Sequence, residues 1–577
     1  MEKVSSKLRR VKTKFTTKEG LIGDYNYSNL FIPKIPIYSD WKQRKSSGQM
    51  ISTQPFFGLD DSMPLLLGAI LGLQHALSML AGIMTPPIII SGVANFDVDT
   101  TQYLVSSSLI ISGLLSMIQI TRFHIYKTPY YLGTGLVSMV GTSFATITIV
   151  TKAIPMMYLN GQCPSAADGT RLPCPDGYGS LLGTAACCSL LEITLSFMPP
   201  KVLQKVFPPL VTGPVVLLIG THLVETGLAN LVGGCGEGNI CQIGRHSAPW
   251  GAAQFIGLGF LVYLTIVLCE KWGSPIMKSC AVIMGLLMGC IVAAATGYFT
   301  HDGIDAAPAV TFPWVKTFKL TVYGPAVLPM LAVFVVLMME AIGDITATCE
   351  VSRTNVEGKE YDSRIQGGVL ADGLNGCLAA LMTMTPVSTF AQNNGVISIT
   401  KCASRTVGYW CCFFLIVMGV FAKFAAALVA IPKPVLGGMT TFLFTSVAVS
   451  GIKIISTTPF TRRDRFVLTA SLMFGLGSVL IPDWFSYVFT YDGDNNGLQG
   501  FFDAIVLVME TGFAVTGFMG VILNLFLPQE LDDNMTADMD VYEQQIVTDD
   551  VAVSSSSEDN KSADRGDVKL STFKAEA

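Results

Sequence analysis

Long apolar runs without a charged residue constrain this chain more than any other feature. Two of them are MPLLLGAILGLQHALSMLAGIM at residues 63–84 and AAQFIGLGFLVYLTIVLC at residues 252–269. Each is close to the roughly 20 residues that a helix needs to cross a bilayer. Charged residues make up only 14% of the chain, against about 25% in soluble proteins. These features predict an all-α polytopic membrane protein, because a membrane β-barrel shows short alternating segments instead.

Hydropathy predicts about fourteen transmembrane segments. The loops that would then face the cytoplasm, such as FTRRDR at residues 460–465, all contain Lys or Arg. The loops on the other side are longer and poorer in basic residues. By the positive-inside rule, this pattern places both termini in the cytoplasm. The segments are expected near residues 63–84, 102–121, 132–153, 180–198, 208–225, 251–270, 278–298, 325–346, 367–384, 387–402, 406–430, 434–452, 466–482 and 500–526.

The fourteen segments divide into seven plus seven at the connection formed by residues 301–324, which is expected to be extracellular. An odd number of segments per half turns the second half upside down, so the chain is predicted to contain inverted repeats at residues 63–300 and 325–527. Residues 1–62 form a polar N-terminal tail without a cleaved signal peptide. Residues 528–577 form an acidic, Ser-rich tail whose composition is typical of disorder.

The third segment of each half is interrupted by polar and small residues. The first half has YYLGTGLVSMVGTSFATITIV, and the second has TPVSTFAQNNGVISITK. Both sequences predict a broken helix whose second part starts near the middle of the membrane. Segments 3 and 10 would then point two helix N-termini, each with unpaired N–H groups, at a shared cavity. The alternative is a re-entrant turn that binds nothing.

Three of the acidic residues within predicted membrane segments are singled out as candidates. Glu340 and Asp344 are one helical turn apart in segment eight, and Asp372 lies in segment nine. Ionisable groups inside a membrane are costly and usually functional, so these three are candidates for ligand binding and for carrying a proton. The alternative is a structural hydrogen-bond network.

QNNGVISITK fits a family signature that reads Gln/Glu/Pro, Asn, any residue, Gly, four residues, Thr, then Arg/Lys/Gly. On this motif, and on segments such as LGLQHALSMLAG and RIQGGVLADGLN, the chain resembles the nucleobase–ascorbate transporter family, also called nucleobase:cation symporter 2. The resemblance covers roughly residues 16–527. It implies a core domain of segments 1–4 and 8–11, and a gate domain of segments 5–7 and 12–14 that forms a homodimer. It also implies proton-coupled, elevator-type symport of uric acid and xanthine across the plasma membrane.

The resemblance also implies roles for individual residues. Gln392 would pair with a purine through its amide, which holds a donor and an acceptor side by side, and Glu340 would accept hydrogen bonds from ring N–H groups. The other candidates for contact with the purine are Asn393, Phe144, Ser143, Phe390 and Ala391. Asp372, Asp344, Glu340 and His75 are candidates for proton coupling, and Arg465, Phe513 and Thr511 for gating. His75 is equally well explained as a histidine hydrogen-bonded in the core, and Arg465 as a positive-inside anchor.

Several other functions find no support in the residues. No His/Cys cluster has metal-ligand spacing, no phosphate-binding loop G-x-x-x-x-G-K-S/T occurs, and no nucleophile–base pair suggests an enzyme. No metal, cofactor or nucleic acid is therefore expected; lipid, protons and the purine are. The alternatives left open are another purine or ascorbate, coupling to sodium, a dicarboxylate or bicarbonate exchanger, and a purine receptor that does not transport. Two cysteine pairs in outside loops, Cys163 with Cys174 and Cys235 with Cys241, could form disulfides.

Overall fold

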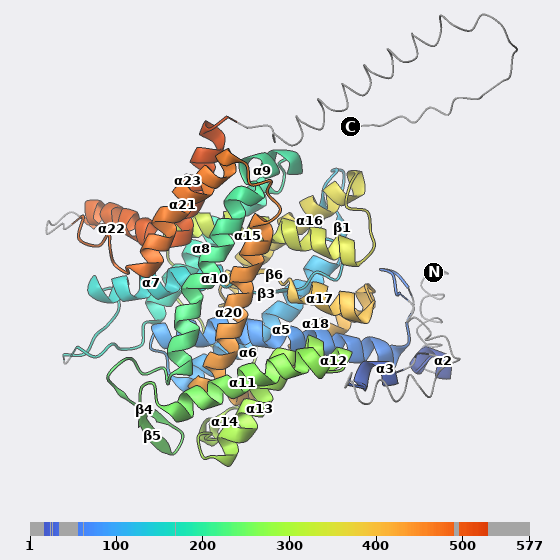
Figure 1. The fold of residues 1–577 in the computed structure, drawn as a ribbon, viewed down its shortest axis with the longest axis horizontal. Helices are drawn as coiled ribbons and strands as arrows, with labels where there is room; N and C mark the ends of the chain where they lie inside the picture. Colours follow the sequence, from blue (N-terminus) through green and yellow to red (C-terminus); the bar gives the residue numbers. More distant parts are fainter. Residues whose placement is uncertain are drawn as a thin grey trace, which may run out of the picture.

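The computed structural model describes residues 17–33 except 24 and 26, and residues 56–61, 63–167, 169–489 and 496–528. The N-terminal tail is described only in part, through the short helices α2 (Lys18–Leu21) and α3 (Ser28–Phe31). Almost all of the acidic C-terminal tail lies outside the described residues. The rest of the chain forms a largely helical body (Figure 1).

The first half supplies seven membrane segments in sequence order. They are α5 (Leu65–Val93), α6 (Val98–Ile120), β3 (Val140–Thr142) with α7 (Ala145–Leu159), α8 (Pro175–Leu195), α10 (Pro209–Leu231), α11 (Ala253–Trp272) and α13 (Ala281–Ala295). Short elements connect them: β1 (Phe123–His124), β2 (Tyr131–Leu132), α9 (Pro200–Val206), β4 (Ile240–Ile243), β5 (His246–Pro249) and α12 (Pro275–Ser279).

The second half supplies seven more segments after α14 (Asp302–Ala306). They are α15 (Gly324–Val351), α16 (Lys359–Leu381), β6 (Val387–Thr389) with α17 (Gln392–Thr400), α18 (Arg405–Val420) with α19 (Ala422–Val429), α20 (Lys433–Ile455), α21 (Arg462–Leu480) and α22 (Asn496–Glu510) with α23 (Gly512–Phe526).

The described helices differ in how well they would span a membrane alone. Seven are long and apolar enough, and nine segments are if each of two bent pairs is counted as one. The remaining segments are short, as in α7, α13 and α17, or carry charged residues near one end, as in α16 and α21. The expected broken segments 3 and 10 are confirmed, because each is a strand followed by a half-helix.

Two further breaks were not expected from the sequence. The continuous helices expected over residues 406–430 and 500–526 are bent by 80° between α18 and α19 and by 84° between α22 and α23. The backbone leaves the helical region at Phe421 and Thr511, whose ψ angles are 88° and 87°. At the second bend a Cβ on Gly512 would lie 2.6 Å from the carbonyl oxygen of Gly475. Glycine therefore allows α23 to begin in direct contact with α21.

The inverted repeat is visible in which helices pack together. The second segment packs on the eleventh (α6 on α18), and correspondingly the ninth packs on the fourth (α16 on α8). The first packs on the eleventh (α5 on α18) as the eighth packs on the fourth (α15 on α8). The fifth and twelfth segments, α10 and α20, occupy equivalent places and pack on each other along their length. The predicted arrangement of seven plus seven segments is thus confirmed.

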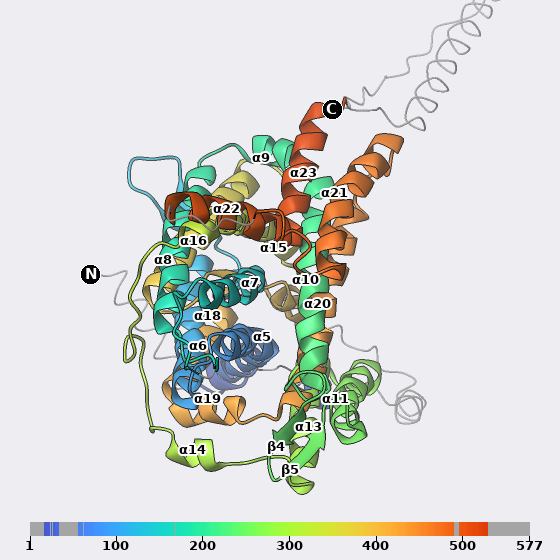
Figure 2. The ribbon, with the colours of Figure 1, turned by 90° about the vertical axis from the view of Figure 1, so that its left-hand side faces the viewer.

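The segments gather into two bodies that follow the expected core and gate grouping, except that α22, the first part of segment fourteen, packs on α15 of the core. Figure 2 shows α10, α11, α13, α20, α21 and α23 on one side and the bundle of α5–α8, α16 and α18 on the other. The apolar interior is continuous across the boundary, because Leu218 and Phe444 of the gate belong to the same buried cluster as Ile147 and Phe334 of the core.

Candidate functional site

Two strands of three residues cross where the halves of the chain meet. β3 and β6 pair antiparallel, with Gly141 opposite Ser388. Each strand is followed directly by a half-helix, and the two junctions read Ser-Phe-Ala at residues 143–145 and Thr-Phe-Ala at residues 389–391. The crossing therefore brings the N-termini of α7 and α17 together, as expected, so that the positive ends of both helix dipoles point toward the crossing.

The phenylalanines of the two junctions lie against each other. The rings of Phe144 and Phe390 are stacked, with centroids 6.2 Å apart and planes inclined by 14°. The Phe390 ring rests on the backbone of β3, because a Cβ on Gly141 would lie 2.6 Å from its Cζ atom. Phe144 also meets the edge of Phe444 on α20 at 5.6 Å. An aromatic row thus runs from the crossing into the gate.

Asp344 joins α15 to the start of α17. The Thr389 hydroxyl donates to Asp344 Oδ2 at 3.0 Å. The Thr348 hydroxyl donates to Asn394 Oδ1 at 2.7 Å, and the Asn394 amide donates to the Asp344 carbonyl at 3.4 Å. These bonds fix α17 relative to the helix face that carries Glu340.

Asn393 is tied to the other side of the site. Its Oδ1 atom lies 2.8 Å from His75 Nδ1, and both side chains are buried. The structure therefore places His75 in contact with the signature motif through α5. Nε2 of His75 has no hydrogen-bond partner among the described residues.

The side chains of Gln392 and Glu340 take no part in this hydrogen-bond network. Both side chains are half-buried, and within the described part of the chain neither the Gln392 amide nor the Glu340 carboxyl makes a hydrogen bond. Gly343 and Ala391 beside them are exposed. The two polar groups are therefore available to a ligand, while Asn393, Asn394 and Asp344 hold the surrounding backbone. Ser143, the remaining candidate at the first junction, is buried, and its hydroxyl accepts from the Ala145 N–H.

Asp372 meets a second acidic residue that the sequence analysis passed over. It is completely buried on α16, next to Glu192 of α8, which is also completely buried. Glu192 is the one acid in the apolar run SLLEITLSF, and an acid inside a membrane segment is itself a functional signal.

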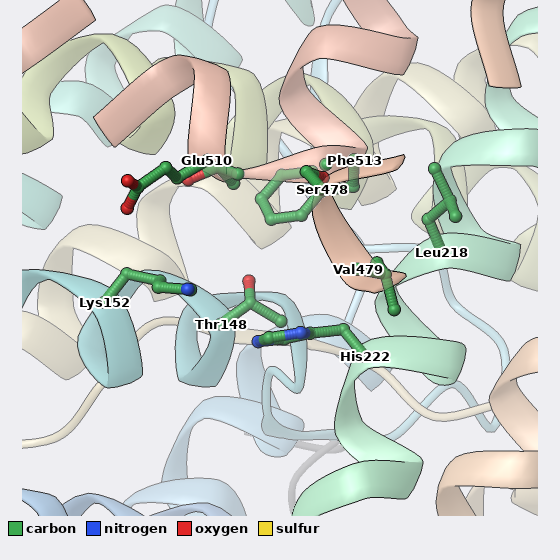
Figure 3. A pocket seen from close by; sticks show the side chains of 10 residues that line it. Thr148, Lys152, Leu218, His222, Ser478, Val479, Glu510 and Phe513 are labelled. Atoms are coloured by element: carbon green, nitrogen blue, oxygen red, sulfur yellow. The ribbon is translucent and has the colours of Figure 1, made fainter. Parts of the chain in front are cut away.

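Two of the candidate gating residues line a pocket between core and gate. Thr511 and Phe513 lie at the break between α22 and α23. Figure 3 shows Phe513 across the pocket from Lys152 of α7 and His222 of α10. The other lining residues are Thr148, Leu218, Ser478, Val479, Glu510 and Gly512. The pocket lies along α7, on the side of the strand crossing toward which α7 extends.

Arg465 lies away from that pocket. It is exposed in the first turn of α21, whereas Ser478 at the pocket is thirteen residues further on, about 20 Å along the helix. The buried arginine of this stretch is Arg463, which donates to the Asn524 carbonyl at 2.7 Å and so fastens α21 to the end of α23.

Both cysteine pairs singled out in the sequence are disulfide-bonded. Cys163 joins Cys174 between α7 and α8, and Cys235 joins Cys241 between α10 and β4. Both bonds lie in loops expected outside the cell, where disulfides persist. The described residues contain no group of three or more His, Cys, Asp or Glu residues arranged to hold a metal ion.

Comparisons with known proteins agree with the motif. Residues 68–484 match the profile of the Permease family, Xan_ur_permease. The chain is 59% identical to a purine permease of Emericella nidulans, over 93% of each chain, and 56% identical to a uric acid-xanthine permease of the same organism, over 92% of each. In fold it is similar to the murine Solute Carrier 26 family member A9 anion transporter, with a TM-score of 0.51 at 10% identity, covering 91% of this chain and 76% of the other. The chain is a multi-pass membrane protein that belongs to the Xan_ur_permease family of permeases.

Proposed function

We propose that this permease is a proton-coupled symporter that carries uric acid and xanthine into the cell. The observation that carries the proposal is the pair of open polar groups, Gln392 and Glu340, at the meeting point of two half-helix N-termini. Uric acid and xanthine are planar and present C=O and N–H groups side by side. The Gln392 amide can pair with such an edge through one donor and one acceptor, while the Glu340 carboxylate accepts from a ring N–H.

The aromatic rings define where the purine would lie. A ring held between two others needs two contacts of about 3.5 Å, or roughly 7 Å between the outer rings. Phe144 and Phe390 are 6.2 Å apart, so a purine enters between them only if they separate. Phe390 is held against Gly141 of β3, whereas Phe144 is half-buried at the edge of the gate. The movement is therefore assigned to Phe144.

Alternating access is supported by a difference between the two half-helices. Ala391, directly before α17, and Gly395 and Ser398 on it are exposed. On α7, all residues from Ala145 to Val150 are buried. With both termini in the cytoplasm, α17 is the inner half-helix, so this is a state open to the cytoplasm. Movement of the core against the gate, as in an elevator, would expose α7 instead.

A homodimer in the plasma membrane is also part of the proposal, and the apolar surface of α11 supports it. Only 33% of the most apolar window of α11 is buried within the chain, and Phe260, Tyr263 and Leu264 are exposed on it. An apolar face of this kind requires lipid or a second gate domain. Proton coupling, rather than sodium coupling, is assigned on the intramembrane carboxyl groups, because a buried carboxyl group can bind and release a proton.

Uptake measurements test the proposal. Radiolabelled xanthine and uric acid are offered to cells without purine carriers of their own, with and without a protonophore. We expect wild-type accumulation that collapses with the protonophore, and no uptake by Gln392→Ala at equal surface abundance. Gln242→Ala, in the exposed hairpin β4–β5, is the matched control and should behave as wild type. Accumulation that resists the protonophore but requires sodium would overturn the proton assignment, and a wild type without uptake would overturn the purine assignment.

A broader purine range is the second candidate. It is favoured by the 59% identity to the relative named purine permease. Competition by unlabelled adenine, hypoxanthine and ascorbate distinguishes it. Inhibition by adenine or hypoxanthine would extend the range to purines that lack the paired oxo groups of xanthine.

A further inference from the structure

Glu192 and Asp372 form a pair of buried acids without a counter-ion. Both have no exposed surface, and their helices α8 and α16 pack directly against each other. The two carboxyl groups act on each other as immediate neighbours. The close approach depends on Gly373, where a Cβ would lie 3.1 Å from Glu192 Cγ.

The count of hydrogen-bond donors around this pair favours a shared proton. All four carboxyl oxygens lack a hydrogen-bond partner among the described residues. Two ionised carboxylates are acceptors only, and two like charges in contact inside a protein repel strongly. One proton turns one carboxyl into a donor and closes a hydrogen bond between the two.

The groups around the pair are acidic as well. Glu340 acts electrostatically on both carboxyls, and Asp344 acts on Asp372. Both residues lie on α15, which packs against α8 and α16. Within the described residues, no basic side chain acts on either member of the pair. The proton is therefore the cation that this place can hold, and its occupancy is linked to the charge on Glu340.

We propose that Glu192 and Asp372 together form the binding site of the transported proton. The proposal rests on the proposed function and deepens it by naming a second residue for the coupling ion. A carboxylate oxygen of the pair takes a proton from water while the core faces outside and returns it to water while the core faces the cytoplasm. One proton enters with each cycle, and no covalent bond of the purine is made or broken.

The test measures proton entry and xanthine entry together. The full-length protein is reconstituted into liposomes with an entrapped pH-sensitive dye, and radiolabelled xanthine is added under an acidic-outside gradient. Glu192→Gln keeps the shape but replaces one carboxyl of the shared site, and its amide donates permanently to Asp372, which favours the ionised form of that carboxyl. We expect it to exchange xanthine at equal pH and to lose both xanthine-dependent proton entry and uphill accumulation. Glu350→Gln, exposed near the end of α15, is the matched control.

Two outcomes separate this proposal from the proposed function. Proton entry per xanthine at the wild-type level in Glu192→Gln overturns the shared site and leaves the symporter intact. A wild type without xanthine-dependent proton entry overturns the symporter itself. If Glu192→Gln does not fold, Glu192→Asp withdraws the carboxyl from Asp372 by one methylene. The shared site then predicts a shifted pH profile of xanthine uptake, and an unchanged profile overturns it.

Discussion

The Thr389 hydroxyl donates a 3.0 Å hydrogen bond to Asp344 Oδ2, and this bond holds β6 against the helix that carries Glu340. A hydrogen bond of this kind contributes about 0.5–3 kcal/mol, the upper part of the range applying to an ionised acceptor. Thr389→Val removes the donor and keeps the shape. We expect KM for xanthine to rise about tenfold, which corresponds to about 1.4 kcal/mol, because Gln392 is displaced relative to Glu340.

Thr389→Ser restores the hydroxyl and should return KM to near the wild-type value. Thr469→Val is the matched control, because Thr469 is exposed on α21 and its hydroxyl bonds only the Arg465 carbonyl. Equal KM values for the Val and Ser variants at position 389 would show that the bond does not position the site.

The His75–Asn393 contact predicts a combined loss of stability and binding. His75→Leu leaves the buried Asn393 oxygen without its partner, which costs about 1–3 kcal/mol. We expect a lower melting temperature of the purified protein and weaker xanthine binding, since Asn393 adjoins Gln392. His75→Gln, which retains a donor, should recover part of both. His301→Leu is the exposed control, and equal melting temperatures for the two Leu variants would contradict the prediction.

Gly141 should tolerate no side chain while Phe390 is present. A Cβ at this position would lie 2.6 Å from the ring, so Gly141→Ala must push Phe390 off β3. We expect uptake to be abolished by Gly141→Ala and partly restored when Phe390→Leu is added. A double-mutant cycle measures that coupling. Gly257→Ala on α11, where nothing lies within 4 Å, should remain active, and strictly additive effects at 141 and 390 would refute the clash.

The half-helix α7 is linked to the gate by an ion pair. Lys152 Nζ lies 3.5 Å from Asp483 Oδ1 in the segment after α21. Exposed pairs contribute less than about 1 kcal/mol, so the expected effect of Lys152→Gln is a few-fold. We expect a cysteine introduced at Thr148 to react faster with an impermeant maleimide when Lys152→Gln is added. The swapped pair Lys152→Asp with Asp483→Lys should slow the reaction again. An unchanged reaction rate in Lys152→Gln would show that this ion pair does not hold α7 against the gate.

Much of the fold followed from the sequence because bilayer crossing leaves a local signal. Apolar length located the segments, and the polar residues of TPVSTFAQNNG marked the break in segment ten. Hydropathy averages over side chains and does not record backbone direction. The bends at Phe421 and Thr511 were therefore missed, although Gly512 beside the second one was a visible hint.

The site was harder to predict than the fold because its contacts join distant parts of the chain. His75 and Asn393 are 318 positions apart, and no local pattern indicates that they touch. Glu192 did carry a local signal, as the one acid in an apolar run, but its pairing with Asp372 depends on how α8 packs on α16. Arg463 and Arg465 are two positions apart, and only the helix orientation shows which one is buried.

The two halves of the chain pack in corresponding ways, so each half can serve as a model for the other in a second conformational state. The Ser-Phe-Ala and Thr-Phe-Ala junctions make Ala391, Gly395 and Ser398 the counterparts of Ala145, Ile149 and Lys152. If each half adopted the conformation of the other, the first three would become covered and the last three uncovered. The conformation of one half is thus a template for the other half in the opposite state, in which Lys152 would be uncovered.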